Sequence, residues 1–572
     1  MLLLLLLLLF SMITKVRAHE SKKSALSGCG GGGHLRRHFG RGGSGTRGVV
    51  VPTLVARRSK YDDASSASSS RRAAAWISSR WRRQSAYVQE DAGGRGLWSG
   101  FFSDNHHHHA ENNNNTTRSI GVASDDVEAV DLVLKAMRAH EKNAHVQAEA
   151  CGALTSLCRN HADNQTRISE AGGVELVLLA MRAHETSAHV QEHACGTLWN
   201  LCHNNHAANK TRIGESREAN GVAVVLSAMR AHATCTGVQE QACAALQNLC
   251  ANHEANARRI VEAAGLTGGV DVILSAMLAH ETSAGVQGHA CAVLRNLSAN
   301  HAENNKTCNP RIVEAGGVDL LLAAMNTHKT NAYVQEEACG ALRNLSANHA
   351  ENKTRIGEKG GVALVLSAMC AHVTRAGVQE QACGALQNLC ANHEANARRI
   401  VKMGGVDVVL SAMRAYETSA GMQGHACAVI GNLSANNAEN KTRIGEAGGV
   451  PTVLAAMRAH ATSAGVQGNA CSALRNLSHN HAENKTRIGE AGGVPTVLSA
   501  MRAHATSARV QEYACGALWN LSANHADNQA RIVEAGGVAA VLSAMRAHET
   551  NEDVQGRACG ALWSLSKRAQ HF

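Results

Sequence analysis

Aromatic residues and prolines are scarce in this sequence, and most of it has no large excess of either charge. Only 3% of the 572 residues are aromatic, so the 44% that are hydrophobic must build an aliphatic core. Four prolines beside 53 glycines exclude collagen-like and proline-rich architectures. Residues 119–572 hold 38 Lys and Arg against 39 Asp and Glu, and this balance argues against nucleic-acid binding by this part of the chain.

The first 118 residues have a different composition, with 18 Lys and Arg against 7 Asp and Glu. An unbroken leucine run, Leu2 to Leu9, is shorter than the roughly 20 residues that span a bilayer, and it predicts a signal peptide or other leader over residues 1–18. Residues 19–118 contain single-residue tracts such as His106–His109. Such tracts bury too little apolar surface to offset the entropy of ordering, which predicts a disordered basic tail.

The features that bear on the cellular compartment point in two directions. Five Asn-Leu-Ser sequons, the first at Asn296, lie inside predicted helices, where a glycan would collide with the fold. Most of the 18 cysteines recur singly at repeated positions rather than in disulfide-like pairs. Both observations favour a cytoplasmic or nuclear protein. The leucine run and the Arg- and Ser-rich stretch behind it leave the secretory pathway or an organelle as the alternative.

From residue 119 onward the sequence repeats. An Ala-Met pair recurs ten times at steps of 44 or 48 residues, and a cysteine follows each methionine by 14 residues, from Met137 and Cys151 to Met545 and Cys559. Ten units of this period predict one solenoid over residues 119–572 rather than several globular domains.

Each unit is expected to form three helices. In residues 439–482 a short polar segment ends at Gly448-Gly449, and an apolar stripe at helical spacing then runs from Val450 to Met457. A second stripe runs from Val466 to Leu477. Because no unit can bury both stripes alone, neighbouring units must stack. The first unit lacks the glycine pair and the last ends in a polar segment, as expected of capping units.

The sequence resembles the armadillo-repeat family. Residues 483–498, ENKTRIGEAGGVPTVL, are similar to the family's Asn-rich first helix, glycine break and second helix, and residues 510–521, VQEYACGALWNL, are similar to its third-helix signature. The resemblance extends over residues 120–572. It implies an all-α, right-handed α-solenoid of ten armadillo-type repeats, whose third helices line a concave groove that binds extended peptides.

Helical geometry separates two faces of the third helix. At 100° per residue, Ala514 and Leu518 cluster near Val510 on the core side, whereas Trp519 and Asn520 lie opposite, on the groove side. The Asn520 position is an asparagine in eight units, and we call it the asparagine column: Asn200, Asn248, Asn296, Asn344, Asn388, Asn432, Asn476 and Asn520.

A side-chain amide can pair with both the N–H and the C=O of a peptide. The family resemblance implies that these asparagines bind a partner's backbone in this way. The competing explanation is a polar helix residue that was copied when the repeats were duplicated.

Importin-α-like nuclear-transport adaptors carry a tryptophan four residues before this asparagine, where it forms slots for lysine side chains. In this sequence the position, which we call the small-residue column, holds Gly152, Gly196, Ala244, Ala292, Gly340, Gly384, Ala428, Ser472, Gly516 and Gly560. The missing tryptophans argue against a nuclear-transport adaptor. That function stays an alternative, in which the basic segment from Arg71 to Arg83 would mimic an importin-binding segment.

Two positions of the third helix vary while the residues around them do not. The first variable row is Glu149, His193, Gln241, His289, Glu337, Gln381, His425, Asn469, Tyr513 and Arg557. The second variable row is Thr155, Trp199, Gln247, Arg295, Arg343, Gln387, Gly431, Arg475, Trp519 and Trp563. Because Trp, Tyr and Arg are favoured binding anchors, we predict that Trp199, Arg295, Arg343, Arg475, Tyr513, Trp519 and Trp563 contact the partner. Drift at exposed sites is the competing explanation.

Other recurring residues do not predict a reactive centre. Histidines recur three residues after the repeat methionine, as at His184, and in Asn-His pairs, as at His253. Packed helices lie about 8–10 Å apart, too far for equivalent histidines to share one metal ion, so we expect them to hydrogen-bond turns and helix ends. Cys383 and Cys390 are two helical turns apart and cannot form a disulfide.

The sequence therefore predicts a non-catalytic scaffold that binds an extended segment of another protein. We expect no enzyme, because no phosphate loop, nucleophile elbow or paired-carboxylate motif is present. No cofactor or metal, no nucleic acid and no stable membrane span are expected, and the chain is expected to be a monomer. A secreted or organellar protein that recognises partners through the variable rows is a further alternative.

Overall fold

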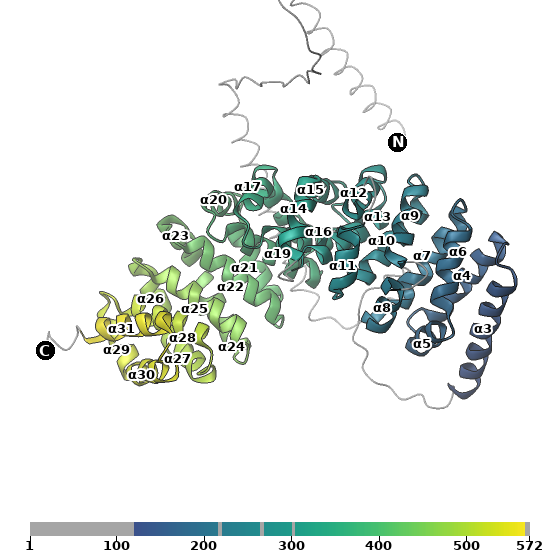
Figure 1. The fold of residues 1–572 in the computed structure, drawn as a ribbon. Helices are drawn as coiled ribbons and strands as arrows, with labels where there is room; N and C mark the ends of the chain where they lie inside the picture. The colour runs from purple at the N-terminus through teal and green to yellow at the C-terminus, as the bar shows by residue number, and fades with distance from the viewer. Residues whose placement is uncertain (1–118, 216–219, 264–267, 300–303, 567–572) are drawn as a thin grey trace, which may run out of the picture. The chain divides into compact units, whose positions relative to one another are not determined.

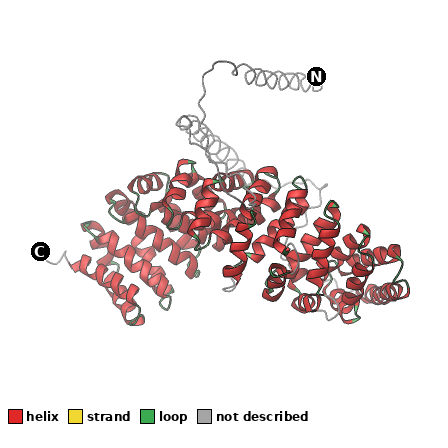
Figure 2. Cartoon of the chain, turned by 45° about the horizontal axis from the view of Figure 1, so that its top comes forward, coloured by secondary structure: helices red, strands yellow, loops and turns green. Residues whose placement is uncertain are grey.

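The computed structural model describes residues 119–215, 220–263, 268–299 and 304–566, all of which belong to one compact unit. Throughout these ranges the regular elements are helices, which follow one another in chain order from α3 to α31 (Figure 1, Figure 2). The predicted leader over residues 1–18 and the predicted disordered tail over residues 19–118 lie outside the described residues.

The three-helix unit predicted from the sequence is confirmed in nine repeats. The first helices are short: α5 Ala162–Glu170, α8 Ala207–Glu215, α11 Glu254–Val261, α14 Asn304–Glu314, α17 Ala350–Glu358, α20 Glu394–Lys402, α23 Ala438–Glu446, α26 Ala482–Glu490 and α29 Ala526–Glu534. The second helices are α6 Gly173–Ala183, α9 Gly221–Ala231, α12 Gly269–Ala279, α15 Gly317–Thr327, α18 Gly361–Ala371, α21 Gly405–Ala415, α24 Gly449–Ala459, α27 Gly493–Ala503 and α30 Gly537–Ala547.

The third helices form the most closely packed row of neighbours in the fold. They are α4 Ala144–Cys158, α7 Ala188–Leu201, α10 Thr236–Cys250, α13 Ala284–Leu297, α16 Ala332–Ser346, α19 Ala376–Cys390, α22 Ala420–Ser434, α25 Ala464–Ser478, α28 Ala508–Ser522 and α31 Glu552–Ser566. A 310 turn, η1 His203–Asn205, follows α7. In the first repeat, which has no glycine pair, one helix, α3 Ser119–Ala139, precedes α4.

The glycine pair separates the first helix from the second for two distinct reasons. Gly448 has a φ of 80°, in the left-handed region that only glycine adopts without cost. At Gly449 a Cβ would lie 2.5 Å from the Ile444 side chain and 2.7 Å from the Ile444 carbonyl oxygen. The first glycine therefore makes the turn, and the second allows the two helices to come into contact.

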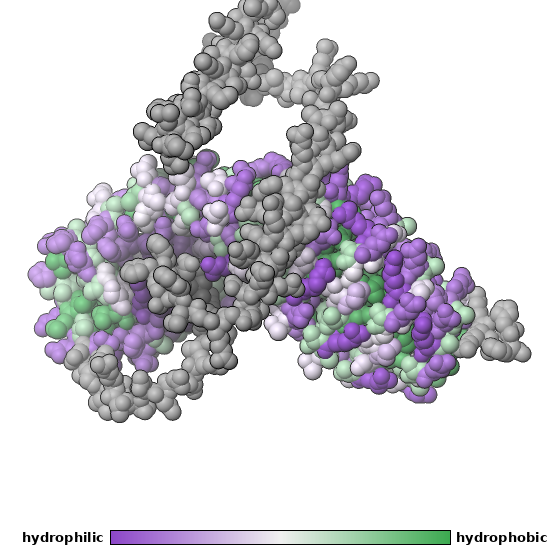
Figure 3. All heavy atoms as spheres, turned by 180° about the vertical axis from the view of Figure 1, so that it is seen from behind, coloured by the Kyte–Doolittle hydropathy of each residue, from purple (hydrophilic) through white to green (hydrophobic). Residues whose placement is uncertain are grey.

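An aliphatic core runs through all the repeats. In α28 the side chains of Val510, Ala514, Leu518 and Leu521 are fully buried, which confirms the core face predicted by helical geometry. The repeat methionine and cysteine are also buried in the internal repeats, so the 14-residue Met-to-Cys spacing marks two core positions. Figure 3 shows one face of the surface, where hydrophilic side chains predominate and hydrophobic patches lie between them.

Histidines join consecutive repeats at the turn between the second and third helices. The Nε2 of His184 is 2.8 Å from the carbonyl oxygen of Glu141 in the preceding repeat, and the column continues in the same way to His548, whose Nε2 is 2.8 Å from the Ala505 oxygen. In one repeat Tyr416 replaces the histidine and donates its hydroxyl to the Val373 oxygen. The predicted role of these histidines as hydrogen-bonding residues is confirmed.

A second histidine column begins the first helices. His393 Nδ1 accepts the backbone N–H of Asn396, so the ring is the N-cap of α20, while its Nε2 lies 3.0 Å from Thr354 of the preceding repeat. The residue before it, Asn392, has a φ of 53°, so this Asn-His pair combines a left-handed turn with a helix cap. One ring thus caps its own helix and contacts the neighbouring repeat.

The first helices also carry buried polar residues that join repeats. Asn396 Nδ2 donates to the Leu389 oxygen and to the Lys353 oxygen, both of the preceding repeat. Lys353 Nζ, which is buried, donates at 2.7 Å to the Ala391 oxygen at the end of the third helix of its own repeat. These bonds satisfy carbonyl groups at the end of the third helix, which would otherwise lack partners.

We predict that Leu342→Ala, in the middle of the core, destabilises the solenoid by about 2–5 kcal/mol, because the cavity left by a fully buried leucine cannot collapse. Leu278→Ala is the matched control, since Leu278 is 61% exposed and its removal leaves no cavity. Urea denaturation followed by circular dichroism measures both variants. Equal midpoints for the two would contradict the core assignment.

We also predict that stability falls as the pH is lowered below about 6.5, the ordinary pKa of histidine. Burial lowers the pKa of His253 and of His393, and each Nδ1 must stay unprotonated to accept its N-cap bond. The unfolded chain therefore takes up protons first, so the caps stabilise the fold above that pKa and lose their effect as the pH falls through the lowered pKa.

The chain contains its own control for this effect, because Asn437 is the N-cap at the equivalent position of α23 and its Oδ1 accepts the Asn440 N–H at 2.9 Å. The double variant His253→Asn/His393→Asn should keep both caps, each worth about 1 kcal/mol. Comparing urea midpoints at pH 7.5 and pH 5.0 should show a smaller loss in the variant than in the wild type. An equal loss would show that the capping histidines do not cause it.

Candidate functional site

The asparagine column lies along the row of third helices, and all but one of its members are half-buried. From Asn248 onward each Nδ2 donates to a carbonyl oxygen of the preceding third helix, as Asn344 does to Arg295 at 2.9 Å and Asn388 to Arg343 at 2.8 Å. Asn200 is buried and bonds its own helix instead, at the Gly196 oxygen. These amides therefore join repeats, a role that the sequence analysis did not foresee.

Part of each amide is not used in this bond. In Asn344, Asn388 and Asn520 the acceptor Oδ1 has no hydrogen-bond partner among the described residues, whereas Asn476 Oδ1 lies 3.4 Å from Arg475. Asn296 and Asn432 differ, because their amides also hydrogen-bond Cys250 and Cys390. The column thus presents fixed acceptors along the third-helix face.

The small-residue column is explained by the second variable row. A Cβ at Gly384 would lie 2.7 Å from Arg343 Cδ, and one at Gly560 would lie 2.6 Å from the Trp519 ring. A side chain of the preceding repeat therefore occupies the space above each of these glycines. In this chain, side chains of the preceding repeat therefore fill the position where the importin-α-like adaptors carry tryptophan.

The sizes of the two residues are matched across the junctions. In the small-residue column of the next repeat, the residue is glycine after Arg295, Arg343, Arg475 and Trp519. It is alanine after Gln247 and Gln387, and serine after Gly431. Gly431 brings α25 so close that a Cβ would lie 3.3 Å from the Ala473 Cα. Trp199 is an exception, because it precedes Ala244 and its ring lies edge-on to His289, two repeats further on, at 5.6 Å.

A second set of matched residues was not found by the sequence analysis. The Glu192 and Glu240 carboxylates lie over Gly237 and Gly285 of the following third helices. Conversely, Gly288 gives room to the Tyr333 ring, which would lie 2.5 Å from a Cβ. The two carboxylates lie beside the first turns of the following helices, α10 and α13, where the helix dipole favours negative charge. Burial and the Glu192 charge raise the pKa of Glu240.

The first and second variable rows meet in pairs across successive repeats. Gln387 Oε1 lies 2.7 Å from His425 Nδ1, and Arg343 donates to Gln381. The guanidinium of Arg475 lies over the Tyr513 ring at 5.2 Å, a cation–π contact. Burial, followed by the Arg343 charge, lowers the pKa of His425 to about 4. Much of the variation in these rows is therefore paired variation between neighbours.

The densest cluster of these pairs extends over α7, α10, α13 and α16. Gln247 Oε1 lies 2.8 Å from both Tyr333 Oη and His289 Nδ1. Arg295 and Glu337 form an ion pair at 2.9 Å, and burial raises the pKa of Glu337 to about 7 although the Arg295 charge lowers it. The cluster is polar but closely packed, so it stiffens this part of the third-helix face.

The predicted partner-binding side chains differ in exposure. Trp199, Arg295, Arg343, Arg475, Tyr513 and Trp519 are half-buried, each in contact with a neighbouring repeat, and Trp563 is 59% exposed. Desolvation lowers the pKa of Arg343 and of Arg475. One edge of each side chain is thus fixed by the scaffold, and the other edge faces solvent.

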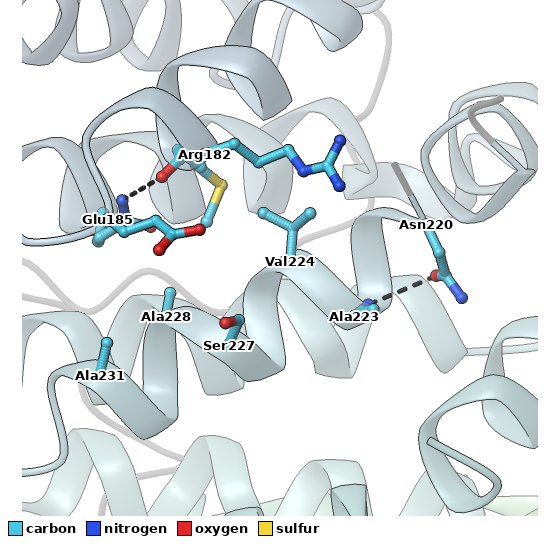
Figure 4. Close-up of a pocket in the computed structure, with 10 residues that line it drawn as sticks. Arg182, Glu185, Asn220, Ala223, Val224, Ser227, Ala228 and Ala231 are labelled. Carbon is cyan, nitrogen blue, oxygen red and sulfur yellow. Dashed lines mark hydrogen bonds between the residues drawn. The ribbon is translucent and has the colours of Figure 1, made fainter. Parts of the chain in front are cut away.

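The opposite side of the repeats has a different kind of surface. A cleft of about 260 Å³ lies between α6 and α9, where Arg182 and Glu185 face Val224 and Ser227 (Figure 4). Similar clefts lie between α21 and α24 and between α24 and α27, lined by small residues of the second helices. They recur because short side chains follow one another along each second helix.

The described residues show no reactive centre of the kinds considered. In these ranges no three His, Cys, Asp or Glu side chains gather closely enough to hold a metal ion. Cys383 and Cys390 are both buried thiols, and burial raises the pKa of each to about 12. No helix of the described part is long and apolar enough to cross a membrane.

Comparison with known families identifies the repeat. A model of the LRRK2 ARM repeat family matches residues 116–487 and 406–570, which together are most of the chain. The chain belongs to this armadillo-repeat family. No curated protein matches.

Solved structures agree with the family assignment. An engineered protein is similar with a TM-score of 0.61 at 28% identity, over 77% of this chain and 99% of that one. A structure from work on a phosphorylation switch that controls the interaction between cadherin and β-catenin is similar with a TM-score of 0.51 at 17% identity, over 89% of this chain and 97% of that one. The all-α solenoid is thus an armadillo solenoid, a fold that suits protein-interaction scaffolds in general.

We predict that the matched sizes at one junction are energetically coupled. In Gly560→Ala the new methyl group displaces the Trp519 ring, whereas Trp519→Gln/Gly560→Ala copies the Gln–Ala combination found elsewhere in the chain. A double-mutant cycle from urea denaturation should give a coupling of about 0.5–3 kcal/mol, the range for residues in contact. Additive effects would show that the two positions vary independently.

Proposed function

We propose that this armadillo solenoid is a non-catalytic scaffold that binds an extended segment of a partner protein along its third-helix face. The observation that carries the proposal is the asparagine column. Its amides are held in a fixed orientation by the preceding repeat, and acceptors such as Asn344 Oδ1 and Asn388 Oδ1 remain for a ligand. Held acceptors at a regular interval suit the backbone N–H groups of an extended chain.

The variable rows would supply the specificity in this proposal. Half-buried Trp199, Trp519 and Tyr513 offer apolar edges, while Arg295, Arg343 and Arg475 offer charge, and Trp563 adds an exposed ring at the last repeat. Because neighbours already fix these side chains, they lose little conformational entropy when a partner binds. Asn200, Asn248, Asn296, Asn432, Asn476 and Asn520 complete the proposed backbone-binding set.

The nuclear-transport alternative lacks a comparable observation. Lysine slots need aromatic walls at the small-residue column, and there Arg343, Arg475 and Trp519 of preceding repeats occupy the space. For the compartment we keep a cytoplasmic or nuclear protein as the proposal. Its support is that Asn296 of the first sequon lies within α13 and its Nδ2, the atom that would carry a glycan, bonds the Gln247 oxygen of the preceding repeat.

The test uses peptides selected from a random 16-residue display library on the full-length chain, with affinities measured by fluorescence anisotropy. The triple variant Asn344→Ala/Asn388→Ala/Asn476→Ala should bind the selected peptides at least tenfold more weakly while its helicity is retained. The loss reflects both missing acceptors and the missing amide bonds to preceding repeats.

A matched variant separates these two contributions. His328→Ala/His460→Ala/His504→Ala also removes three hydrogen bonds between repeats, but at the turns away from the third-helix face. It should bind the peptides as the wild type does. Unchanged affinity in the asparagine variant, or an equal loss in the histidine variant, would refute the proposed site. Tight binding of a lysine-rich peptide by the wild type would favour the transport adaptor.

A further inference from the structure

Two adjoining clefts lie on the second-helix side of the solenoid, away from the third-helix face. One has a volume of about 400 Å³ and lies between α21 and α24, and the other has a volume of about 460 Å³ and lies between α24 and α27. Figure 4 shows a cleft of the same kind, between α6 and α9. Because α24 borders both of the larger clefts, a ligand that filled them would lie across three successive repeats.

A buried glutamine lines each of these two clefts. Gln423 is 2% exposed and Gln467 is 1% exposed. Nε2 of Gln423 donates to the carbonyl oxygens of Met413 and Tyr416, and Gln467 makes the equivalent pair of bonds in the next repeat. Both amide N–H groups are therefore used. Oε1 has no hydrogen-bond partner among the described residues, and it is the group that each glutamine can offer a ligand in the cleft.

The two carbonyl groups hold the amide in this orientation. At Gln379, the equivalent residue of the repeat before Gln423, Nε2 makes the same two bonds, although Oε1 is completely buried there without a partner. The orientation is thus kept even where it leaves an acceptor unsatisfied, which costs free energy. In the two clefts the acceptors are therefore in place before a ligand binds.

The remaining walls have room for an aromatic ring. Met413, Pro451 and Ala455 line the cleft between α21 and α24, and residues at the equivalent positions line the other cleft. The charged side chains of the first cleft, Arg414 and Glu417, are exposed. A cavity of about 150 Å³ holds one benzene ring, and methionine sulfur makes favourable contacts with ring edges. Apolar walls around one buried acceptor suit a ring that carries a donor, such as the indole of tryptophan or the phenol of tyrosine.

The spacing of the two clefts suits an α-helix. Neighbouring packed helices lie about 8–10 Å apart, so equivalent clefts on either side of α24 are separated by about that distance. Seven residues of an α-helix span about 10.5 Å and return a side chain to the same face. A helix that lies across α21, α24 and α27 can therefore place one ring in each cleft, from positions seven residues apart.

We propose that these two clefts dock an α-helix of a partner protein, which inserts two donor-bearing aromatic side chains, tryptophan or tyrosine, spaced seven residues apart. Each indole N–H or phenol O–H donates to the unpaired Oε1, of Gln423 in one cleft and of Gln467 in the other. The clefts lie on the side of the repeats opposite to the third-helix face. The helix is therefore a different ligand from the extended segment proposed above, and neither proposal depends on the other.

The test uses the full-length chain and labelled alanine-based helical peptides of about 25 residues, long enough to be helical in water, with binding followed by fluorescence anisotropy. A peptide with two tryptophans seven residues apart should bind at least tenfold more tightly than one with the tryptophans eleven residues apart. Both pairs lie on one face of the helix, but eleven residues span about 16.5 Å, so the second peptide can fill only one cleft. Equal affinities would overturn the proposal.

A further peptide tests the two acceptors. In 3-benzothienylalanine a sulfur atom replaces the indole N–H, so the ring keeps its shape and loses its donor. Replacing both tryptophans with this residue should weaken binding at least tenfold, because each Oε1 would be covered without a partner. If the two peptides bind equally well, the clefts do not select a donor and the proposal is wrong.

Variants of the chain locate the site. Ala455→Asp/Ser499→Asp places a carboxylate in each cleft at an exposed position, and it should weaken binding of the peptide with the seven-residue spacing at least tenfold, because the rings would bury a charge. Ala438→Asp/Ala482→Asp adds the same charge at exposed alanines of α23 and α26 and should bind as the wild type does. Circular dichroism checks that both variants fold.

Two results with these proteins would contradict the proposed docking site. The first is equal affinity of the cleft variant and the control variant for the peptide. The second is a wild type that binds free indole but none of the peptides, which would indicate a site for a small molecule rather than for a helix.

Discussion

The described repeats of this solenoid do not satisfy all of their own polar groups, and the fold depends on the hydrogen bonds that each repeat receives from its neighbours. The turn carbonyl of one repeat accepts from the histidine of the next, as Glu417 accepts from His460. The end of a third helix accepts from a first-helix side chain of the next repeat, as Leu389 accepts from Asn396. An aliphatic core would allow repeats to slide against one another, since apolar contact has little direction. Directional bonds at fixed positions set one register, and every repeat therefore places its third helix in the same orientation.

The candidate site consists of the side-chain groups that the hydrogen bonds and contacts between repeats leave available. Each asparagine donates one amide N–H to the preceding third helix. Its Oδ1, held in place by that bond, is what it can offer a partner. The three arginines and Trp519 of the second variable row likewise lie on glycines of the next repeat and present one edge outward. A scaffold whose binding groups are parts of its own junctions needs little reorganisation on binding. For the same reason, a substitution in the site also changes the contact between two repeats.

The sequence alone predicted those features that recur within one unit. The period, the glycine break, the apolar stripes and the fully buried Val510, Ala514 and Leu518 all follow from spacing along a single helix or turn. What it did not predict are contacts between residues about 45 positions apart. The pairing of Glu192 with Gly237, the bond from Asn396 to Lys353 and the bond from Asn344 to Arg295 all join different repeats. In a periodic sequence every repeat offers the same candidates, so spacing cannot show which neighbour a side chain reaches. The matched sizes along the second variable row and the small-residue column were a usable signal, because they compare one repeat with the next.

This matching also constrains how such a chain can change. Residues 225–260 and 365–400 are near-copies, and the similarity continues into the following third helices, VQGHACAVLRNL and MQGHACAVIGNL. Both copies contain the same contact between adjacent repeats, Gln247 with His289 in one and Gln387 with His425 in the other. After these pairs the two copies differ, and both positions of the next junction differ together. Arg295 stands before Gly340 of the next repeat in one copy, and Gly431 stands before Ser472 in the other. A duplication that ended after one repeat would separate the two halves of such a pair. Two consecutive repeats, rather than one, are therefore the smallest segment that can be copied with its junction intact.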